Sequence, residues 1–299
     1  YGRRNFETIG ENYMKNLIIS AESTCDLPKE IVDKYGIEIA PVDYFVDGEE
    51  YNTKTNHMEE KEFYEKMKNG ADVKTSQVNF ESAKDFLQNL LSTGKDVLHI
   101  SFSSGLSGTS NNFKLACEEL SQNYQNRCAV VDSLCASAGQ GLLVLLVAKK
   151  AEQENITFDQ LVKYAEDIKL RINHIFTVDD LKYLIKGGRV SKTSAYLANI
   201  LHIKPLMKMD DDGKLTVTQK VFSRKITIKK MFEKMLSNYD THYGDILICE
   251  ANCTNDANTL SKYIFDGFGI NPIVVPLDYC IGSHSGPGTL AVFYVGDKR

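Results

Sequence analysis

Short apolar stretches alternate with amphipathic stretches along the first half of the chain. The apolar stretches have the length of strands, whereas the amphipathic ones repeat their apolar positions with the period of a helix. The expected strands are 17–20, 37–45, 96–101 and 128–131, and the expected helices are 28–35, 59–69, 79–91, 109–120 and 139–153. Strands that alternate with helices indicate βαβ units, so we predict a parallel sheet between helical layers, as in a Rossmann-like domain.

The pattern changes after about residue 170. The expected strands there are 175–178, 203–209, 215–222, 245–249, 273–277 and 289–295, and the expected helices are 191–201, 224–236 and 255–265. Three aspartates and a glycine at 210–213 predict a hairpin between two of these strands. A hairpin among helices indicates a mixed sheet. The predicted fold class is therefore α/β with two domains, an αβα domain with a parallel sheet over 14–170 and an α+β domain over 171–299.

Length and composition agree with a globular chain of two domains. The chain has 299 residues, and one domain usually takes ~100–200. The net charge of −5 argues against nucleic acid as the main partner, because phosphate binding needs a dense basic surface. The longest apolar run, 142–148, is far shorter than the ~20 residues of a membrane span, so we expect no integral membrane segment.

The N-terminus and the cysteines bear on processing and compartment. Residues 1–13 are mostly polar, lack the apolar core of a signal peptide and precede Met14, so we treat them as an added extension. The seven cysteines are an odd number without C-x-x-C spacing, which disfavours a disulfide framework or a zinc site. We expect small buried thiols in a reducing compartment, and hence a cytoplasmic protein.

Three polar segments follow or precede expected helices. Residues 74–77 carry hydroxyls that suit a helix N-cap. The small-residue loop 103–109 joins a strand to a helix, where backbone N–H groups can bind an anion. A tight turn without a ligand explains the small residues equally well. Residues 186–192 contain a glycine pair and three basic side chains, which a helix C-cap followed by a solvated face would also produce.

A fourth segment, 281–288, is rich in glycine and holds His284. We expect an irregular loop between two strands there. A histidine in such a loop does not lie on a regular core face, so His284 is a better candidate for a site than His99 or His174, which lie in strand-like stretches.

Several catalytic and metal motifs are missing from the sequence. The 103–109 loop lacks the Gly-Lys-Ser/Thr ending of a P-loop, and no stretch reads G-x-S-x-G. No H-x-x-x-H spacing occurs, and the aspartates at 210–212 are too few for a calcium loop. We therefore expect neither a bound metal nor an enzyme cofactor.

Taken together, these segments resemble the DegV family of bacterial fatty-acid-binding proteins. The resemblance covers the chain from Met14 onward, and its motifs occur in order: 22–28, 75–77, 103–109, 131–133, 186–192 and 282–288. It implies two α/β domains with a palmitate- or stearate-like long-chain fatty acid between them. Some members of the family are the lipid-carrying subunit of a two-component fatty acid kinase, whose ATP-binding partner converts the bound carboxylate into an acyl-phosphate.

The resemblance also implies roles for particular residues. Thr75 and Ser104 resemble the hydroxyls that hold the carboxylate, and His284 resembles the imidazole beside it. Arg189 and Arg224 resemble basic residues at the mouth, with a role in kinase contact or phosphoryl transfer. The supporting head-group residues would be Ser76, Ser103, Gly105 and Ser283. The chain would then be a lipid-binding protein rather than an enzyme.

This sequence departs from the family pattern at three places. Val78 stands where proline is usual, so we expect the segment after Gln77 to be less stiff. Glu22 replaces the usual aspartate. Phe222 and Ser223 replace a usual Arg-Gly pair, which removes one basic group near the expected kinase contact.

Two other functions stay open at this point. A hydrolase or acyltransferase could use Ser104 or Ser107 with His284, although no acid is evident to orient the imidazole. A nucleotide-binding regulator could use the same loops for phosphate, although the glycine spacing of such sites is missing.

Overall fold

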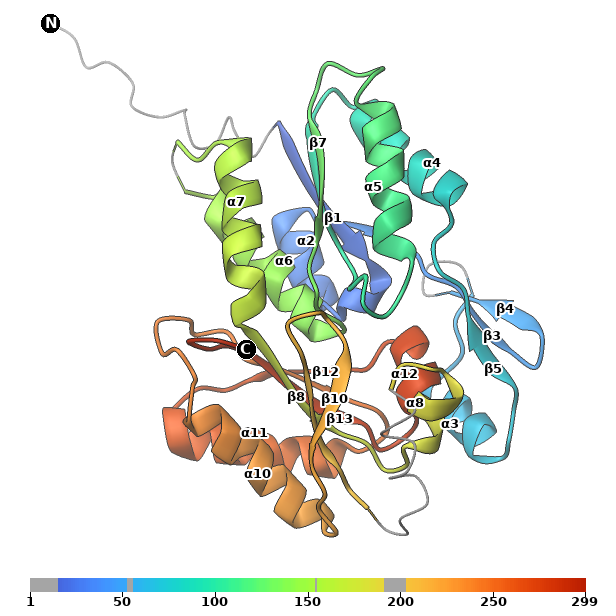
Figure 1. Cartoon of the computed structure of the whole chain (residues 1–299), viewed down its shortest axis with the longest axis vertical. Helices are drawn as coiled ribbons and strands as arrows, with labels where there is room; N and C mark the ends of the chain where they lie inside the picture. The colour runs from blue at the N-terminus through green and yellow to red at the C-terminus, as the bar shows by residue number, and fades with distance from the viewer. Residues whose placement is uncertain (1–15, 53–55, 154, 191–202) are drawn as a thin grey trace, which may run out of the picture.

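The computed structural model describes residues 16–52, 56–153, 155–190 and 203–299, and its strands form three sheets (Figure 1). The extension expected over 1–13 and the helix expected over 191–201 lie outside the described residues.

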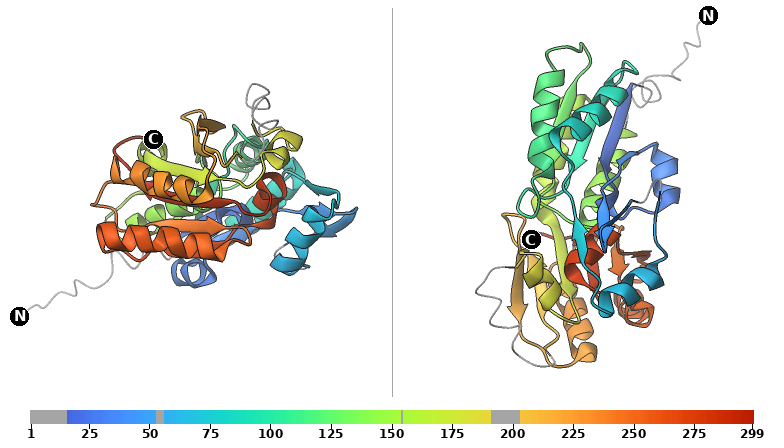
Figure 2. Two further views of the ribbon diagram at one scale, coloured as in Figure 1. Left: turned by 90° about the horizontal axis from the view of Figure 1, so that it is seen from below. Right: turned by 90° about the vertical axis from the view of Figure 1, so that its right-hand side faces the viewer.

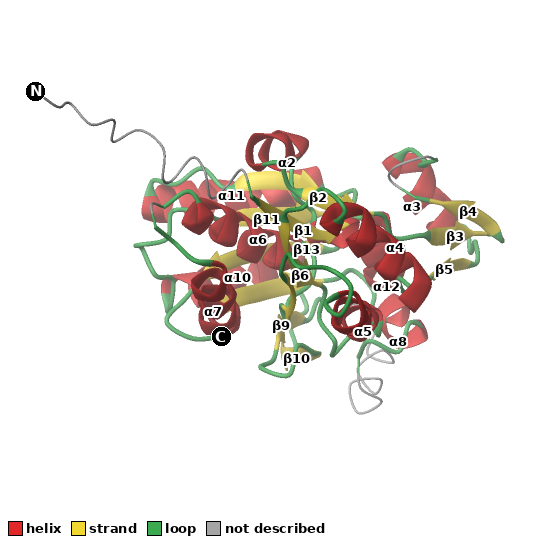
Figure 3. Ribbon diagram, turned by 90° about the horizontal axis from the view of Figure 1, so that it is seen from above, coloured by secondary structure: helices red, strands yellow, loops and turns green. Residues whose placement is uncertain are grey.

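The first sheet has four parallel strands in the order β2-β1-β6-β7. They are β1 (Leu17–Glu22), β2 (Glu38–Ala40), β6 (Asp96–Ser101) and β7 (Cys128–Asp132). The helices near this sheet are η1 (Ser23–Cys25), α2 (Lys29–Tyr35), α4 (Phe80–Leu91), α5 (Thr109–Leu120), α6 (Ala138–Ala151) and α7 (Phe158–Ile168). Helices α4 and α5 pack on β6, and α6 packs on β1 and β6 from the other side (Figure 3). The predicted parallel sheet and αβα layering are confirmed.

The second sheet has six strands in the order β10-β9-β8-β13-β11-β12. They are β8 (Ile172–Thr177), β9 (Leu206–Met209), β10 (Leu215–Gln219), β11 (Leu247–Glu250), β12 (Ile273–Pro276) and β13 (Leu290–Val295). Only β11 and β12 pair in parallel, so this sheet is mixed, as predicted. The hairpin expected at 210–213 joins β9 to β10, and Gly213 takes the positive φ of +71° that the turn needs.

Helices α10 (Arg224–Leu236) and α11 (Thr254–Phe268) cover one face of the second sheet (Figure 2). Their apolar residues, such as Met231 and Leu260, meet strand residues in a buried cluster of their own.

Helix α6 lies between the two large sheets and touches both (Figure 1). Each of its residues except Lys149 and Lys150 is buried, as expected for a helix that is apolar on all sides. One continuous buried cluster runs from β1 through α6 to β8 and β13, and the short η2 (Lys169–Arg171) joins the halves. The two domains predicted on either side of residue 170 thus share one hydrophobic core.

A small antiparallel sheet of order β4-β3-β5 lies beside α3 (Glu60–Lys68). Its strands are β3 (Tyr44–Val46), β4 (Glu49–Tyr51) and β5 (Val73–Thr75). The prediction of one strand over 37–45 was wrong. Pro41 follows β2 and has no N–H for a ladder, so the first sheet ends there and the chain continues into the small sheet.

Two further helices differ from the expectations. Helix α7 was not predicted, although Thr157 and Gln160 form the capping box that marks its start. The loop expected over 281–288 was also wrong, because α12 (Tyr279–Ser285) occupies its first half. Asp278 caps this helix by accepting the Cys280 N–H at 2.8 Å. Gly282 allows close packing, since a Cβ there would lie 2.4 Å from the Tyr64 hydroxyl oxygen.

Candidate functional site

A cavity of about 430 Å³ lies between the two large sheets, beyond the carboxyl ends of β1 and β6. Ligands of open parallel sheets lie at this edge. Most of its wall is apolar and includes Phe102, Leu106, Phe176, Met209, Ile281 and Phe293. The cavity therefore suits a ligand that is mainly hydrocarbon.

Polar side chains gather where the cavity meets β5 and α12. Thr75 ends β5, and His284 lies in the last turn of α12. Thr75 Oγ1 and His284 Nε2 are 2.7 Å apart, although 209 residues separate them in sequence. Ser76 and Gln77 line the same region. The structure thus brings together two of the three residues expected to hold a carboxylate.

The third expected residue, Ser104, does not lie on the cavity wall. Its residue is exposed, and its backbone N–H donates to Asp132 Oδ1 at 3.1 Å. Ser107, one turn further along the same loop, lines the cavity instead. Ser107 Oγ lies 3.0 Å from Thr109 Oγ1, at the start of α5. From the sequence, Ser107 was a candidate only in the hydrolase alternative, because the local pattern does not show which serine of the loop faces inward.

Ser103 and Gly105 contact the β9–β10 hairpin and do not line the cavity. The Ser103 hydroxyl donates to the Gly213 carbonyl at 2.8 Å and accepts the Gly105 N–H at 3.1 Å. A Cβ at Gly105 would lie 2.5 Å from the Asp212 carbonyl oxygen, so the hairpin needs a glycine there. Both residues therefore join the two halves of the chain.

His284 is surrounded by groups that disfavour its charged form. Burial, and then the nearby Arg189 guanidinium, lower the pKa of His284 to about 4. The ring is therefore neutral near pH 7.

Arg189 follows α8 (Lys182–Lys186) and is half-buried on the cavity wall. Its Nη1 donates to the Gly187 carbonyl, and burial lowers the pKa of its guanidinium. Arg189, Thr75 and His284 also line an outer groove whose other cations are Lys68, Lys74, Lys182 and Lys186. The polar end of the cavity thus opens toward a basic groove.

Ser283, expected to support the head group, and Arg224, expected at the mouth, do not lie on the cavity wall. Ser283 lines the outer groove, and its hydroxyl donates to the Tyr279 carbonyl at 2.7 Å. Arg224 begins α10 and is not part of the cavity wall; its Nε donates to Asp256 Oδ2 at 2.8 Å.

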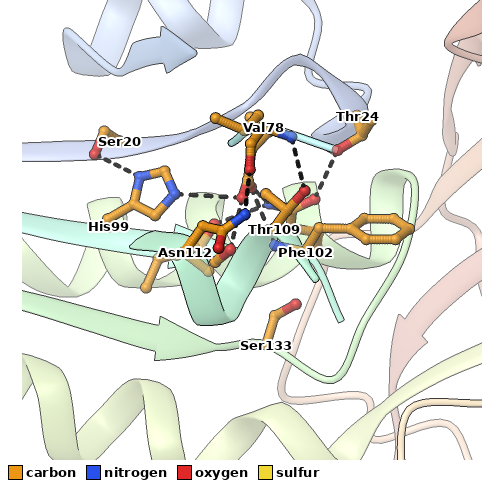
Figure 4. A network of polar contacts seen from close by, with 12 residues as sticks. Ser20, Thr24, Val78, His99, Phe102, Thr109, Asn112 and Ser133 are labelled. Atoms are coloured by element: carbon orange, nitrogen blue, oxygen red, sulfur yellow. Dashed lines mark hydrogen bonds and ion pairs between the residues drawn. The ribbon is translucent and has the colours of Figure 1, made fainter. Parts of the chain in front are cut away.

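Val78 is held on both sides by α5, as Figure 4 shows. Its N–H donates to Thr109 Oγ1 at 3.2 Å, and its carbonyl accepts from Asn112 Nδ2 at 2.7 Å. A proline here could not make the first bond, because it has no N–H. The valine thus gives the segment after Gln77 a hydrogen bond in place of the stiffness of a proline ring.

A buried polar network supports the cavity near β1 (Figure 4). The Glu22 carboxylate accepts from Ser101 Oγ at 2.6 Å, the Phe102 N–H at 3.1 Å and Gln140 Nε2 at 2.6 Å. Burial raises the pKa of Glu22, but His99 and these donors outweigh burial and hold the pKa below its usual range. One buried carboxylate thus accepts hydrogen bonds from β6, from the residue that follows it and from α6.

Sequence reasoning did not place Thr24, Ser137 and His174 on the wall, where the structure has them. His174 Nε2 accepts the Ala136 N–H at 3.1 Å, so its Nδ1 donates to the Ile172 carbonyl at 3.1 Å. Burial and, next, Arg299 lower the pKa of His174 well below its usual range. Thr24 lies within the 22–28 motif, whereas Ser137 and His174 lie outside the motifs, so no local signal marked them.

Among the described residues, no helix is long and apolar enough to cross a membrane. No group of three or more histidine, cysteine or acidic side chains in those ranges could hold a metal ion. All seven cysteines are free.

Comparisons with known proteins match nearly the whole chain to one family. Residues 16–297 match the family model described as an uncharacterised protein of the DegV family. The chain is 34% identical over 290 residues to a DegV domain-containing protein of Clostridium perfringens, covering 96% of this chain and 99% of that protein.

Solved structures show the same fold. A fatty acid binding DegV family protein from Streptococcus agalactiae superposes with a TM-score of 0.81 at 27% identity, over 95% of this chain and 99% of that chain. A Thermotoga maritima protein, described as revealing fatty acid binding function, has a TM-score of 0.80 at 26% identity, over 94% of this chain and 99% of that chain.

Proposed function

Because the chain belongs to the DegV family, we propose that it binds a long-chain fatty acid in the cavity between its two large sheets. The cavity itself carries this proposal: its wall is mostly apolar, and Thr75, Ser107, His284 and Arg189 lie on it, with Thr75 Oγ1 2.7 Å from His284 Nε2. The S. agalactiae and T. maritima relatives, both described as fatty acid binding proteins, support it.

The carboxylate would lie beside Thr75, Ser107 and His284. A carboxylate taken out of water needs several hydrogen-bond donors. The hydroxyls of Thr75 and Ser107 supply two, and the N-terminus of α5, which begins at Thr109, favours negative charge. A carboxylate within hydrogen-bond reach of His284 would also raise the pKa of the imidazole from about 4, because it favours the charged ring.

The hydrocarbon tail would provide most of the affinity. Each buried methylene contributes about 0.8 kcal/mol, so a tail of about fifteen gives ~12 kcal/mol before the costs of ordering and association. A hydrogen bond to a charged group nets about 1.5–3 kcal/mol. The polar end therefore orients the ligand, whereas the apolar wall retains it.

We further propose that the protein presents the carboxylate to an ATP-binding kinase subunit in the cytoplasm. The basic groove outside Thr75 and His284 would face the phosphates of the nucleotide, and Arg189 lies on both the cavity and the groove. Arg224, in its ion pair with Asp256, stays a candidate for contact with the kinase surface only. The product would be an acyl-phosphate.

Lipid extraction tests the binding function directly. Protein purified from cells is denatured, extracted with organic solvent and examined by mass spectrometry, and the delipidated protein is refolded and titrated with palmitate and stearate. We expect one fatty acid per chain in the extract and rebinding of added acid. Protein that yields no fatty acid and rebinds none would contradict the proposal.

The kinase role needs a second readout. Lipid-loaded protein is incubated with ATP and the kinase subunit of a related bacterium, and acyl-phosphate is trapped with hydroxylamine. We expect hydroxamate only when both proteins are present. A loaded protein that gives no product with several such kinases would leave a lipid-binding protein without the presentation role.

The geometry favours a carrier over a hydrolase. His284 Nε2 contacts Thr75 rather than a serine. An imidazole with a pKa near 4 is also a weak general base at neutral pH. Ester turnover by the purified protein alone would reverse this conclusion.

A further inference from the structure

Ser103 begins the loop that carries Ser107, and both its backbone and its hydroxyl are hydrogen-bonded. Its N–H donates to the Cys135 carbonyl at 3.0 Å. Its carbonyl accepts the Leu106 N–H at 3.1 Å and the Ser107 N–H at 3.2 Å. Ser103 is completely buried, so water does not compete for these bonds. The backbone of Ser107 is therefore held directly by Ser103.

The Ser103 hydroxyl connects this loop to the tip of the β9–β10 hairpin, which belongs to the second half of the chain. It donates to the Gly213 carbonyl at 2.8 Å, across 110 residues of sequence. Gly213 is itself buried, and a Cβ there would lie 2.1 Å from Ser103 Oγ. Any side chain at position 213 would therefore displace the Ser103 hydroxyl.

The two residues that flank the hairpin tip lie on the cavity wall. Met209 ends β9 and Leu215 begins β10, and they pair across the antiparallel ladder. The Asp210 carbonyl accepts the Gly213 N–H at 3.0 Å, which closes the turn between them. A ligand that fills the cavity would thus contact the same hairpin whose tip holds Ser103.

Ser107 presents its hydroxyl to the cavity from the other end of the loop. Ser107 Oγ accepts the Thr109 N–H at 3.3 Å and lies 3.0 Å from Thr109 Oγ1. The Thr109 hydroxyl can donate its proton to Ser107 Oγ, which leaves the Ser107 proton for a ligand carboxylate. This direction of the Ser107 side chain depends on the backbone that Ser103 holds.

We propose that Ser103 is a positioning residue: its hydrogen bond to the hairpin tip orients the Ser107 hydroxyl toward the fatty acid carboxylate, so that the protein selects acids over neutral lipids. This rests on the proposed fatty acid binding. Ser103 does not line the cavity, so it acts through Ser107. Recognition of the carboxylate in the first half of the chain is then set by the hairpin of the second half.

The affinities for palmitate and methyl palmitate test the proposal. The two ligands share one tail, but only palmitate carries a charged head group, so the ratio of their Kd values reports the head-group contacts. Ser103→Ala should raise the Kd for palmitate on the order of tenfold, the loss expected for a hydrogen bond to a charged group, and that for the ester by no more than about twofold. Ser104→Ala, which removes an exposed hydroxyl of the same loop, should keep the native ratio.

A double-variant cycle separates positioning from general loosening of the protein. If Ser103 acts through Ser107, the Ser103→Ala/Ser107→Ala protein should bind palmitate no more weakly than the Ser107→Ala protein. Additive losses, or equal losses for palmitate and its ester in Ser103→Ala, would show a merely structural role and refute the proposal.

Two glycines form a matched pair for the hairpin side of the contact. Gly213 and Gly269 have φ values of +71° and +70°, so alanine strains the backbone similarly at both. A Cβ at Gly269 meets no atom within 4 Å, whereas one at Gly213 meets Ser103 Oγ. Gly213→Ala should therefore reduce the preference for palmitate over its ester, and Gly269→Ala should not. The same preference in these two variants would contradict the role of the hairpin.

Hydrogen exchange of the lipid-free proteins distinguishes failure of this inference from failure of the proposed function. Measured by mass spectrometry, exchange in peptides that cover 104–109 should be faster in Ser103→Ala than in the native protein. If palmitate does not bind but the loop exchanges faster, the proposed function fails and Ser103 still holds the loop. Native exchange of the loop in Ser103→Ala would overturn the positioning role, whether or not lipid binds.

Discussion

Side chains a few positions apart in one loop have different roles here. Ser103 donates to the hairpin carbonyl of Gly213, Ser104 faces solvent, and Ser107 lies on the cavity wall. All three are small hydroxyl residues in one seven-residue segment, so their chemistry does not distinguish them. Only the direction of each side chain does.

Ser107→Ala and Ser104→Ala therefore form a matched pair. Removal of the Ser107 hydroxyl should cost about 1.5–3 kcal/mol of binding, because it removes a hydrogen bond to a charged group. That loss corresponds to roughly a tenfold or larger rise in Kd. Fatty acid titration by calorimetry should show it, with Ser104→Ala close to native. Equal losses in both variants would mean that the carboxylate does not lie where we propose.

At the scale of elements, α6 and α12 determine where the cavity lies and which side chains meet in it. Helix α6 separates the two large sheets, and α12 brings His284 to Thr75. The start of α6 is tight, because a Cβ at Gly139 would lie 2.1 Å from His174 Nε2. His174 is itself a wall residue, held by the Ala136 N–H. Packing at the start of α6 and the shape of the cavity are thus coupled.

Gly139→Ala should destabilise the protein by about 1–3 kcal/mol, the usual cost of overpacking. Gly244→Ala is the control, since a Cβ at Gly244 meets no atom within 4 Å and its φ lies outside the left-handed region. Urea denaturation followed by circular dichroism measures both, and the control should stay within about 0.5 kcal/mol of native. A neutral Gly139→Ala would show that His174 moves aside without cost.

At the scale of the whole molecule, the two halves share contacts beyond the lipid cavity. The Arg299 guanidinium donates to the carbonyls of Leu134, Lys169, Ile172 and Asp210, at 2.7–3.1 Å. These four carbonyls come from both halves and from the segment that joins them. Together with the continuous core around α6, they make us expect one cooperative unfolding transition.

Arg299→Met tests this link, because methionine keeps an apolar stem but donates no hydrogen bond. Loss of these hydrogen bonds should cost about 1–3 kcal/mol or more in unfolding free energy. Lys298→Met, at an exposed neighbouring position, should have little effect. A second unfolding transition in the native protein, or no loss in Arg299→Met, would show that the halves are stabilised separately.

The sequence by itself determined the order and type of most elements, the mixed second sheet, the hairpin at 210–213 and the membership of the family. These depend on the periodicity of apolar residues, on turn chemistry and on local motifs, all of which lie within short windows. It also selected Thr75 and His284, because both lie in such motifs.

The tertiary structure alone decided which of these residues meet. Ser107 rather than Ser104 faces the cavity, His284 lies on a helix and is neutral, and Ser103 contacts Gly213 across 110 residues. Each of these depends on packing between distant segments, which sets both the direction of a side chain and the dielectric around it. Local sequence carries neither quantity, because both arise only when the two halves close around α6.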